Sequence, residues 1–408
     1  MLTILTLPHP QVLARLPGAP EGTRGISLFA VPRCKLEADG SNGDLNGAKI
    51  GRIEDKMGCH GSPTCEINFD EAQGHLIGTE NRGLNHMFTF INTSRMGTAI
   101  QGLAAAENAF QNALWYAKDR CSMRSLTGTK NPAGPADPII CHPDVRKMLL
   151  TQKCISEGGR AMLFDCGLLA DVMADAASSG NDELHKQMDD DMGFVTPILK
   201  GFLTELGVEA ANIGIQVYGG HGYIKSNKQE QVLRDVRIAP VWEGTTGIQG
   251  LDLLGRKIML QKFKPINRQC AMMRADCIKL IMEGGGGNTR AHAMTLLKHV
   301  IEWQYLTYRI GMKAKSDKDA IGAASVDYLM YSGYIMMAGQ WLKMEAAACK
   351  ALKDGDAAQD KEFYEAKIKT SQFYFDGILP RTRSLTETMM CPVSSVMDMK
   401  EEHFAFDH

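Results

Sequence analysis

The first part of the chain alternates apolar and polar side chains with a period of two, which is typical of β-strands. Residues 26–30 follow this pattern before Pro32, and residues 66–70 follow it again. Between them, a cluster of Gly, Asn and Asp at 38–44 indicates a turn. The first ninety or so residues are therefore predicted to be β structure.

From Arg95 onward the apolar spacing changes to three and four residues, which is typical of amphipathic helices. One predicted helical face carries Ile100, Leu103, Phe110 and Leu114, and a later seven-residue repeat carries Met148, Ile155, Met162 and Leu169. A further helix is predicted to begin at Thr196-Pro197, a cap followed by proline, and to end at Gly219-Gly220. The bulk of the chain should be packed helices.

A last helical region is marked by a stripe of large apolar residues at heptad spacing: Met330, Tyr334, Met337, Trp341 and Met344. Such a methionine-rich stripe is far more often core than a binding surface. The sequence thus predicts an α+β fold that is mostly α, in three parts. These are a partial β-barrel domain over 1–85, a helical domain over 86–262 and a helical C-terminal extension over 263–408.

Composition limits the functions that the chain can have. Its 408 residues suffice for two or three domains, and 45 Lys and Arg nearly balance 47 Asp and Glu. No basic field exists to attract nucleic acid. No stretch approaches the roughly 18 apolar residues of a membrane span, and residues 1–8 lack the basic flank of an export signal. The 11 cysteines form no C-x-x-C pair, so we expect no metal site and a reducing, cytoplasmic setting, or the mitochondrial matrix in a eukaryote.

Three linked segments carry the chemistry: Gln216–Tyr223, Arg234–Ile238 and Trp242–Gln249. Together they resemble the signature of the acyl-CoA dehydrogenase family. Shorter matches are Lys56–Gly58, Gly61–Cys65, Asn92–Arg95 and Tyr116–Arg120. Within the family the chain resembles the branch that includes 3-methylmercaptopropionyl-CoA dehydrogenase and long-chain relatives, through Met123–Gly128, Pro135–Ile140 and the extension to Phe404. The resemblance runs from about Leu13 to the end.

The resemblance implies an FAD enzyme of β-oxidation that removes two hydrogens from an acyl-CoA thioester. Glu243 would abstract the α-proton while the β-hydrogen leaves as hydride to flavin N5. A solvated carboxylate is too weak a base for this proton, so we expect Glu243, beside Trp242, to sit in a dry pocket that raises its pKa. Electrons would pass to an electron-transfer flavoprotein.

The resemblance also assigns binding roles to individual residues. Those expected at FAD are Arg120, Ser122, Gln216, Gly219, Gly220, Thr245 and Gly247, and those expected at the substrate are Asn92, Arg95 and Gly244. An arginine fork suits the flavin pyrophosphate, and Arg120 is expected to reach the flavin of a neighbouring subunit in a homodimer or larger assembly. Two plainer interpretations stay open: a helix C-cap at Gly219-Gly220, and a structural role for Arg95.

Complete members of the branch begin with a helical domain and a flavin-covering loop whose motifs are not found here. We therefore expect an N-terminally shortened chain with unpaired strand edges and exposed apolar surface. Two alternatives to the dehydrogenase remain. An acyl-CoA oxidase would pass its electrons to oxygen and release hydrogen peroxide, and a flavin-free remnant would act only as an assembly subunit.

Overall fold

Two units make up the chain in the computed structural model, Met1–Ser94 and Arg95–His408. The structure describes residues 11–284, 286–354 and 360–405, without the side chains of Leu36 and Asn92. Within these residues, helices predominate and strands are confined to the first unit, so the predicted fold class is confirmed. The predicted domain boundaries after residues 85 and 262 stay predictions.

The first unit contains three small antiparallel sheets. Its strands are β1 Gln11–Arg15, β2 Ile26–Ala30, β3 Cys34–Leu36, β4 Asn42–Leu45, β5 Ala48–Ile53, β6 Cys65–Phe69 and β7 His75–Ile77. They join in the orders β1-β2-β7, β3-β4 and β5-β6. In the largest sheet Leu28 pairs with both Leu13 and Ile77 and is buried, whereas Leu45 and Ile53 of the two-stranded sheets are exposed. The predicted strands at 26–30 and 66–70 are confirmed. The second strand begins and ends one residue earlier than predicted, at Cys65 and Phe69.

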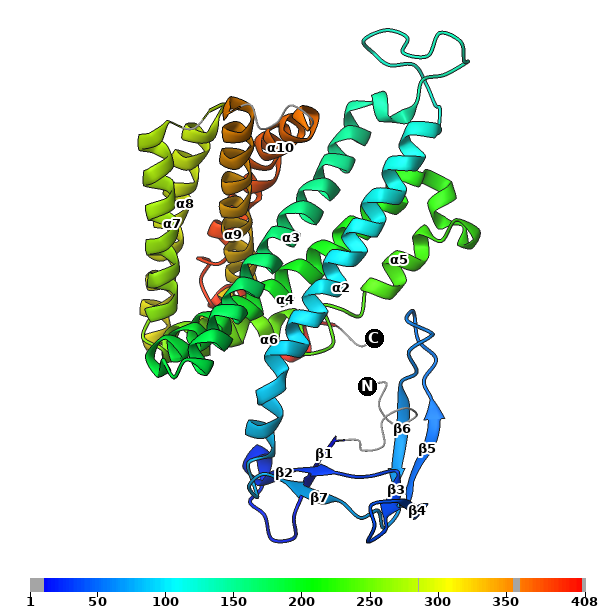
Figure 1. Ribbon diagram of the computed structural model, residues 1–408, viewed down its shortest axis with the longest axis vertical. Coiled ribbons are helices and arrows are strands. Elements are labelled where there is room, and N and C mark those ends of the chain that lie inside the picture. Colours follow the sequence, from blue (N-terminus) through cyan, green and yellow to red (C-terminus); the bar gives the residue numbers. More distant parts are fainter. Residues whose placement is uncertain (1–10, 285, 355–359, 406–408) are drawn as a thin grey trace. The chain divides into compact units, whose positions relative to one another are not determined.

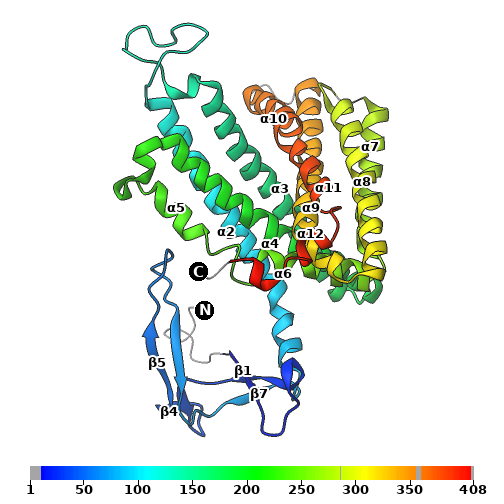
Figure 2. The same cartoon turned by 180° about the vertical axis from the view of Figure 1, so that it is seen from behind.

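The helices gather in two groups, as Figure 1 shows: α2, α3 and α4 with the short α5 and α6, and then α7 to α10. Their bounds are α2 Gly83–Asp119, α3 Pro143–Ser178, α4 Asp182–Tyr218, α5 Gln229–Val236, α6 Thr246–Leu251, α7 Lys264–Glu283, α8 Thr289–Ser316, α9 Asp319–Asp354, α10 Lys361–Phe373, α11 Thr382–Thr388 and α12 Ser394–Met397. A π-helix, Asp252–Leu260, continues α6. The opposite view shows α11 against α9 (Figure 2).

The prediction that a helix begins at Thr196-Pro197 is wrong. α4 begins at Asp182, after Asn181, whose side chain accepts a hydrogen bond from the Leu184 amide at 3.2 Å. Pro197 therefore lies in the helix interior, where a proline removes a hydrogen bond and costs about 3 kcal/mol. Burial outweighs this cost, because the helix is enclosed around Ile198. The predicted end is confirmed, since Gly219 caps the helix after Tyr218.

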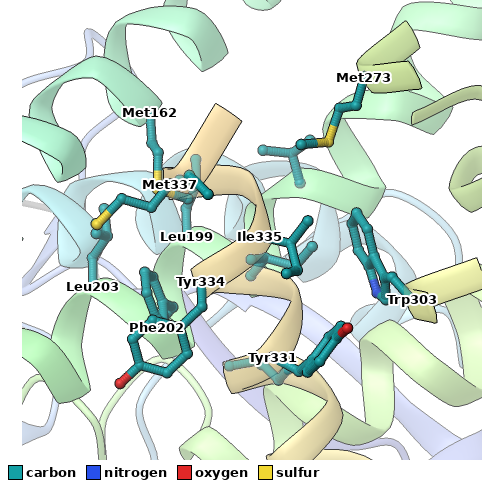
Figure 3. Close-up of a cluster of buried hydrophobic side chains, with 14 of the residues drawn as sticks. Met162, Leu199, Phe202, Leu203, Met273, Trp303, Tyr331, Tyr334, Ile335 and Met337 are labelled. Carbon is teal, nitrogen blue, oxygen red and sulfur yellow. The ribbon is translucent and has the colours of Figure 1, made fainter. Parts of the chain in front are cut away.

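The main core lies where α4 crosses α9. Phe202 of α4 meets Tyr334 of α9 edge-on, with ring centroids 4.9 Å apart (Figure 3). Gly333 permits this approach, because a Cβ there would lie 2.2 Å from the Phe202 ring. Met337 and Trp341 of the same stripe are fully buried, so its interpretation as core is confirmed. On α2, by contrast, Leu103 is buried but Ile100, at the edge of the predicted face, is exposed.

None of the helices in the described ranges has an apolar stretch long enough to cross a bilayer.

Replacing Trp341 by alanine should destabilise the helical unit strongly. The change would leave a large cavity and remove the hydrogen bond that the indole N–H donates to the Cys154 carbonyl at 3.3 Å. We expect the free energy of unfolding, measured by urea denaturation, to fall by about 3–5 kcal/mol. Trp115→Ala is the control, because Trp115 is 74% exposed and should change stability by no more than about 0.5 kcal/mol. Equal losses in the two variants would contradict the assignment of Trp341 to the core.

Candidate functional site

A cavity of about 360 Å³ lies beside the C-terminal ends of α2 and α4. Its lining comprises Tyr116, Arg120, Ile139, Val217, Tyr218, Gly219, Gly220 and His221. The structure therefore brings together three of the predicted flavin ligands, Arg120 and the adjacent pair Gly219 and Gly220, which follow it by 99 residues or more in the sequence. The volume falls within the range usual for small-molecule sites.

The glycine turn that forms one side of the cavity follows from the way α4 ends. Gly219 has φ 59° and ψ −142°, a conformation that favours glycine, and its N–H donates to the Gln216 carbonyl. The chain then enters a 3-10 turn, Gly219–Tyr223, that folds back under the helix end. Gly222 permits this, since a Cβ there would lie 2.5 Å from the Ile215 carbonyl oxygen. A Cβ on Gly219 or Gly220 would meet no atom within 4 Å, so the backbone of both is open to a ligand.

Aromatic side chains form a rigid wall of the cavity. Tyr116 stacks on Tyr218 with ring centroids 4.1 Å apart, and its hydroxyl lies 2.9 Å from Nδ1 of His221. Burial raises the pKa of Tyr218, so its phenol stays neutral. Gln216 is exposed and contributes only its carbonyl, which caps the helix; its side chain does not line the cavity.

Arg120 is the charged group at this cavity. Within the described part of the chain its guanidinium makes no hydrogen bond or ion pair, and it is exposed. The loop that follows is held by buried Asp137, whose pKa is lowered by hydrogen bonds led by the Ser125 amide. Ser122 donates its N–H to the Asp137 carbonyl at 3.0 Å and does not line the cavity. An unpaired guanidinium facing open glycine backbone fits a phosphate or pyrophosphate group.

A second loop, between Trp242 and α6, carries the predicted base. Glu243 has φ 55° and Gly244 has φ 91°, so two consecutive residues adopt the left-handed region. A Cβ on Gly244 would lie 2.6 Å from the side-chain nitrogen of Gln249. Thr245 caps α6 by accepting from the Ile248 amide at 3.3 Å. Neither Thr245 nor Gly247 lines the cavity at Arg120.

Two buried side chains donate hydrogen bonds to the backbone carbonyls of this loop. Lys200 of α4 donates through Nζ to the Gly244 carbonyl at 2.6 Å, and Gln249 donates to the carbonyls of Glu243 at 3.1 Å and Gly244 at 3.2 Å. Lys200 is 0% exposed. Burial, and then the charge of Arg95, lower the pKa of Lys200 to about 8.

The expectation that Glu243 is enclosed is wrong: its side chain is exposed. The two carbonyls of this loop are directed at the buried donors, and the carboxylate is left on the solvent side. The indole N–H of neighbouring Trp242 is buried and has no hydrogen-bond partner among the described residues. An unpaired buried donor next to the predicted base is a natural contact for a polar ligand atom.

The two remaining residues that the sequence predicted at the substrate are Arg95 and Asn92. Arg95 is 6% exposed and forms an ion pair at 2.7 Å with Asp252, which is 7% exposed, so the structure gives it the structural role that the sequence left open. A contact between Arg95 and acyl-CoA stays a prediction. Asn92 lies in α2, but its side chain is outside the described residues.

Lys200 was not found from the sequence. It stands between Leu199 and Gly201 in the most apolar part of α4. A single cation inside a run that otherwise predicts core is the available clue, because an unpaired lysine is rarely buried.

In a comparison with known protein families, the Gly219–Tyr223 turn and the Glu243 loop fall within one match. Residues 81–259 match the family described as "Acyl-CoA dehydrogenase, C-terminal domain", and residues 264–400 match "Acetyl-CoA dehydrogenase C-terminal like".

Curated relatives match almost the whole chain. The 3-methylmercaptopropionyl-CoA dehydrogenase of Ruegeria pomeroyi is 38% identical over 90% of this chain and 60% of its own length. The broad-specificity linear acyl-CoA dehydrogenase FadE5 of Mycobacterium tuberculosis is 31% identical over 96% of this chain and 65% of its own length. A butyryl-CoA dehydrogenase of Syntrophomonas wolfei is 30% identical over 96% of this chain and 64% of its own length. The chain thus spans less than two thirds of the length of these relatives.

Solved structures share the fold. The acyl-CoA dehydrogenase from Bacillus anthracis complexed with FAD superposes with a TM-score of 0.71 at 16% identity, covering 94% of this chain and 60% of its own. Caenorhabditis elegans ACDH-11 in complex with C11-CoA superposes with a TM-score of 0.68 at 20% identity, covering 89% of this chain and 56% of its own.

Buried Lys200 predicts a pH dependence of stability. Its pKa is about 8 in the folded chain against an ordinary 10.5, so between these values the unfolded state binds more protons and stability rises with pH. We expect the free energy of unfolding of the chain, minus that of Lys200→Met, to be level below about pH 8 and to increase toward pH 10.5. Urea denaturation of both proteins at a series of pH values measures this difference. A difference that decreases over the same range would contradict the burial of the ammonium.

Proposed function

The chain belongs to the acyl-CoA dehydrogenase family, and from that premise we propose that it catalyses FAD-dependent α,β-dehydrogenation of an acyl-CoA thioester. The observation that carries the proposal is the meeting of Arg120 with the Gly219-Gly220 turn around one cavity. A cation and accessible backbone at one place suit the pyrophosphate of a flavin dinucleotide, and the residues directly after α2 and α4 supply both.

The residues at that cavity fit a dinucleotide. Arg120 would hold the pyrophosphate by its free guanidinium fork, and the cofactor would approach the backbone of Gly219 and Gly220 closely because no side chain intervenes. When bound, FAD supplies the hydride acceptor. Contacts of Ser122, Gln216, Thr245 and Gly247 with FAD belong to the same proposal. The FAD-complexed Bacillus anthracis protein shares this fold.

Glu243 is proposed to abstract the proton α to the thioester carbonyl. Its carboxylate projects from a loop whose backbone is fixed by Lys200 and Gln249, so its position is set before a ligand arrives. An acyl thioester lying over the exposed side chain would exclude water and strengthen the base. Gly244, Asn92 and Arg95 are proposed to contribute to acyl-CoA binding.

The substrate is proposed to be a saturated acyl-CoA, because the relatives named above act on 3-methylmercaptopropionyl-, linear acyl- and butyryl-CoA. We propose an electron-transfer flavoprotein as the electron acceptor and a homodimer or larger assembly in the cytoplasm. Hydrogen peroxide formed in step with substrate oxidation would instead identify an oxidase.

The exposure of Glu243 favours a second candidate, a chain that by itself holds no flavin and turns over no substrate. Reconstitution decides between the two. Purified chain incubated with FAD and freed of excess should retain the visible flavin absorption band if the first proposal is right, and should lack it if the second is.

Glu243→Gln should abolish turnover and leave the flavin in place. The amide keeps the shape of the side chain but cannot accept the α-proton, so we expect a loss of about 10²- to 10⁴-fold in the rate of butyryl-CoA-dependent dye reduction. The control is Glu71→Gln, because Glu71 is also exposed and also has a positive φ, of 51°. Equal activity of the two variants would remove Glu243 from the mechanism.

Arg120→Met should weaken FAD binding without unfolding the chain. Loss of a charge-assisted bond to phosphate is expected to raise the dissociation constant by about tenfold or more, as measured by flavin fluorescence titration. Arg146→Met, at an exposed position of α3, serves as the control. An unchanged dissociation constant for the Arg120 variant would place the pyrophosphate elsewhere.

A further inference from the structure

We propose that Lys200 is a positioning residue for Glu243: its buried ammonium holds the Gly244 carbonyl and so fixes the left-handed backbone that presents the carboxylate. The catalytic consequence of this rests on the proposed function. The structural part, that Lys200 rigidifies the loop, does not.

The loop needs an external anchor. Glu243 has a positive φ although it is not a glycine, and such a conformation persists only where the surroundings enforce it. The backbone hydrogen bonds of the segment are local. The amides of Val241 and Trp242 donate to the Ile238 carbonyl at 2.9 and 3.0 Å, the Thr246 amide to the Pro240 carbonyl at 3.1 Å and the Gln249 amide to the Thr245 carbonyl at 2.9 Å. None of these bonds involves Glu243 or Gly244. The carbonyls of these two residues depend on side chains, which are those of Lys200 and Gln249.

Of the two anchors, Lys200 comes from an element distant in the sequence. Gln249 lies in α6, the helix that directly follows the loop. Lys200 lies in the buried middle of α4, between Leu199 and Gly201, and its 2.6 Å bond is the shortest of the three side-chain bonds to the carbonyls of Glu243 and Gly244. A charged donor also forms a stronger bond than a neutral amide.

The charges around Lys200 show that stability alone does not account for it. Arg95 repels the ammonium, and Asp252 is already paired with Arg95. Glu205 and Glu243 attract it, but Glu205 accepts from the Thr246 hydroxyl at 2.5 Å and Glu243 faces solvent. The only acceptor bonded to Lys200 among the described residues is the Gly244 carbonyl. Burying a cation against a neutral partner costs stability, in keeping with its lowered pKa, and a side chain kept at such a cost suggests a functional role.

Three full-length proteins test the proposal: Lys200→Met, Lys200→Arg and the control Lys153→Met. Met matches the length of lysine without its charge or donors, and Arg keeps both. Lys153 is a part-buried helical lysine, paired with Glu157 at 2.5 Å in α3. Hydrogen–deuterium exchange of the segment 240–249, read by mass spectrometry, and thermal unfolding at pH 7 need neither FAD nor substrate. Steady-state kinetics with butyryl-CoA adds kcat and KM for the FAD-loaded protein.

In Lys200→Met, exchange across 240–249 should accelerate by about tenfold or more, while the melting temperature stays equal or rises. Turnover should fall by about 10²-fold in kcat with little change in KM, because the base is misplaced and substrate binding is not. Lys200→Arg should recover part of both effects, and Lys153→Met should show neither.

Unchanged exchange in Lys200→Met would overturn the proposal. So would a melting temperature that falls in parallel with faster exchange over the whole helical unit, because Lys200 would then be a structural residue. If the loaded wild-type chain is inactive but 240–249 still loosens in the variant alone, the proposed function has failed and the anchoring role of Lys200 stands.

Discussion

The enclosure of the middle of α4 is the constraint on which the rest of the helical unit depends. From Met192 to Thr204 every residue is buried, and this burial tolerates even an interior proline. One end of α4 forms the glycine turn at the Arg120 cavity, and its middle supplies Lys200 to the Glu243 loop. Both parts of the candidate site therefore take their positions from the same buried helix.

Two buried cations of the helical unit, Arg95 and Lys200, differ in the partner that each one has. The Arg95–Asp252 pair neutralises itself at 2.7 Å, so it can serve as a structural connection between α2 and the π-helix. Lys200 has no such carboxylate partner, and its charge is directed to a backbone carbonyl. Isolated buried charge is costly, so the second arrangement is understandable as a device that holds a strained loop.

The exposed position of Glu243, the proposed base, separates two properties that such a base needs, a fixed position and enclosure from water. Its backbone geometry is determined within this chain, by Lys200, Gln249 and the two left-handed residues. Its enclosure is not, because no described part of the helical unit covers the side chain. The described helices therefore supply a preorganised position for the carboxylate and leave it accessible to water.

The sequence by itself determined the fold class, the family and the candidate residues, because strand and helix periods are local and the segments 216–223 and 242–249 are short enough to be identified directly. It also fixed the end of α4 at Gly219, since a positive φ there requires glycine. Only the tertiary structure decided where α4 begins, that Arg95 is paired and that Lys200 anchors the loop. Each of these depends on partners about 40 to 160 residues away or on enclosure from several sides, and burial of that kind overrides local helix signals such as Thr196-Pro197.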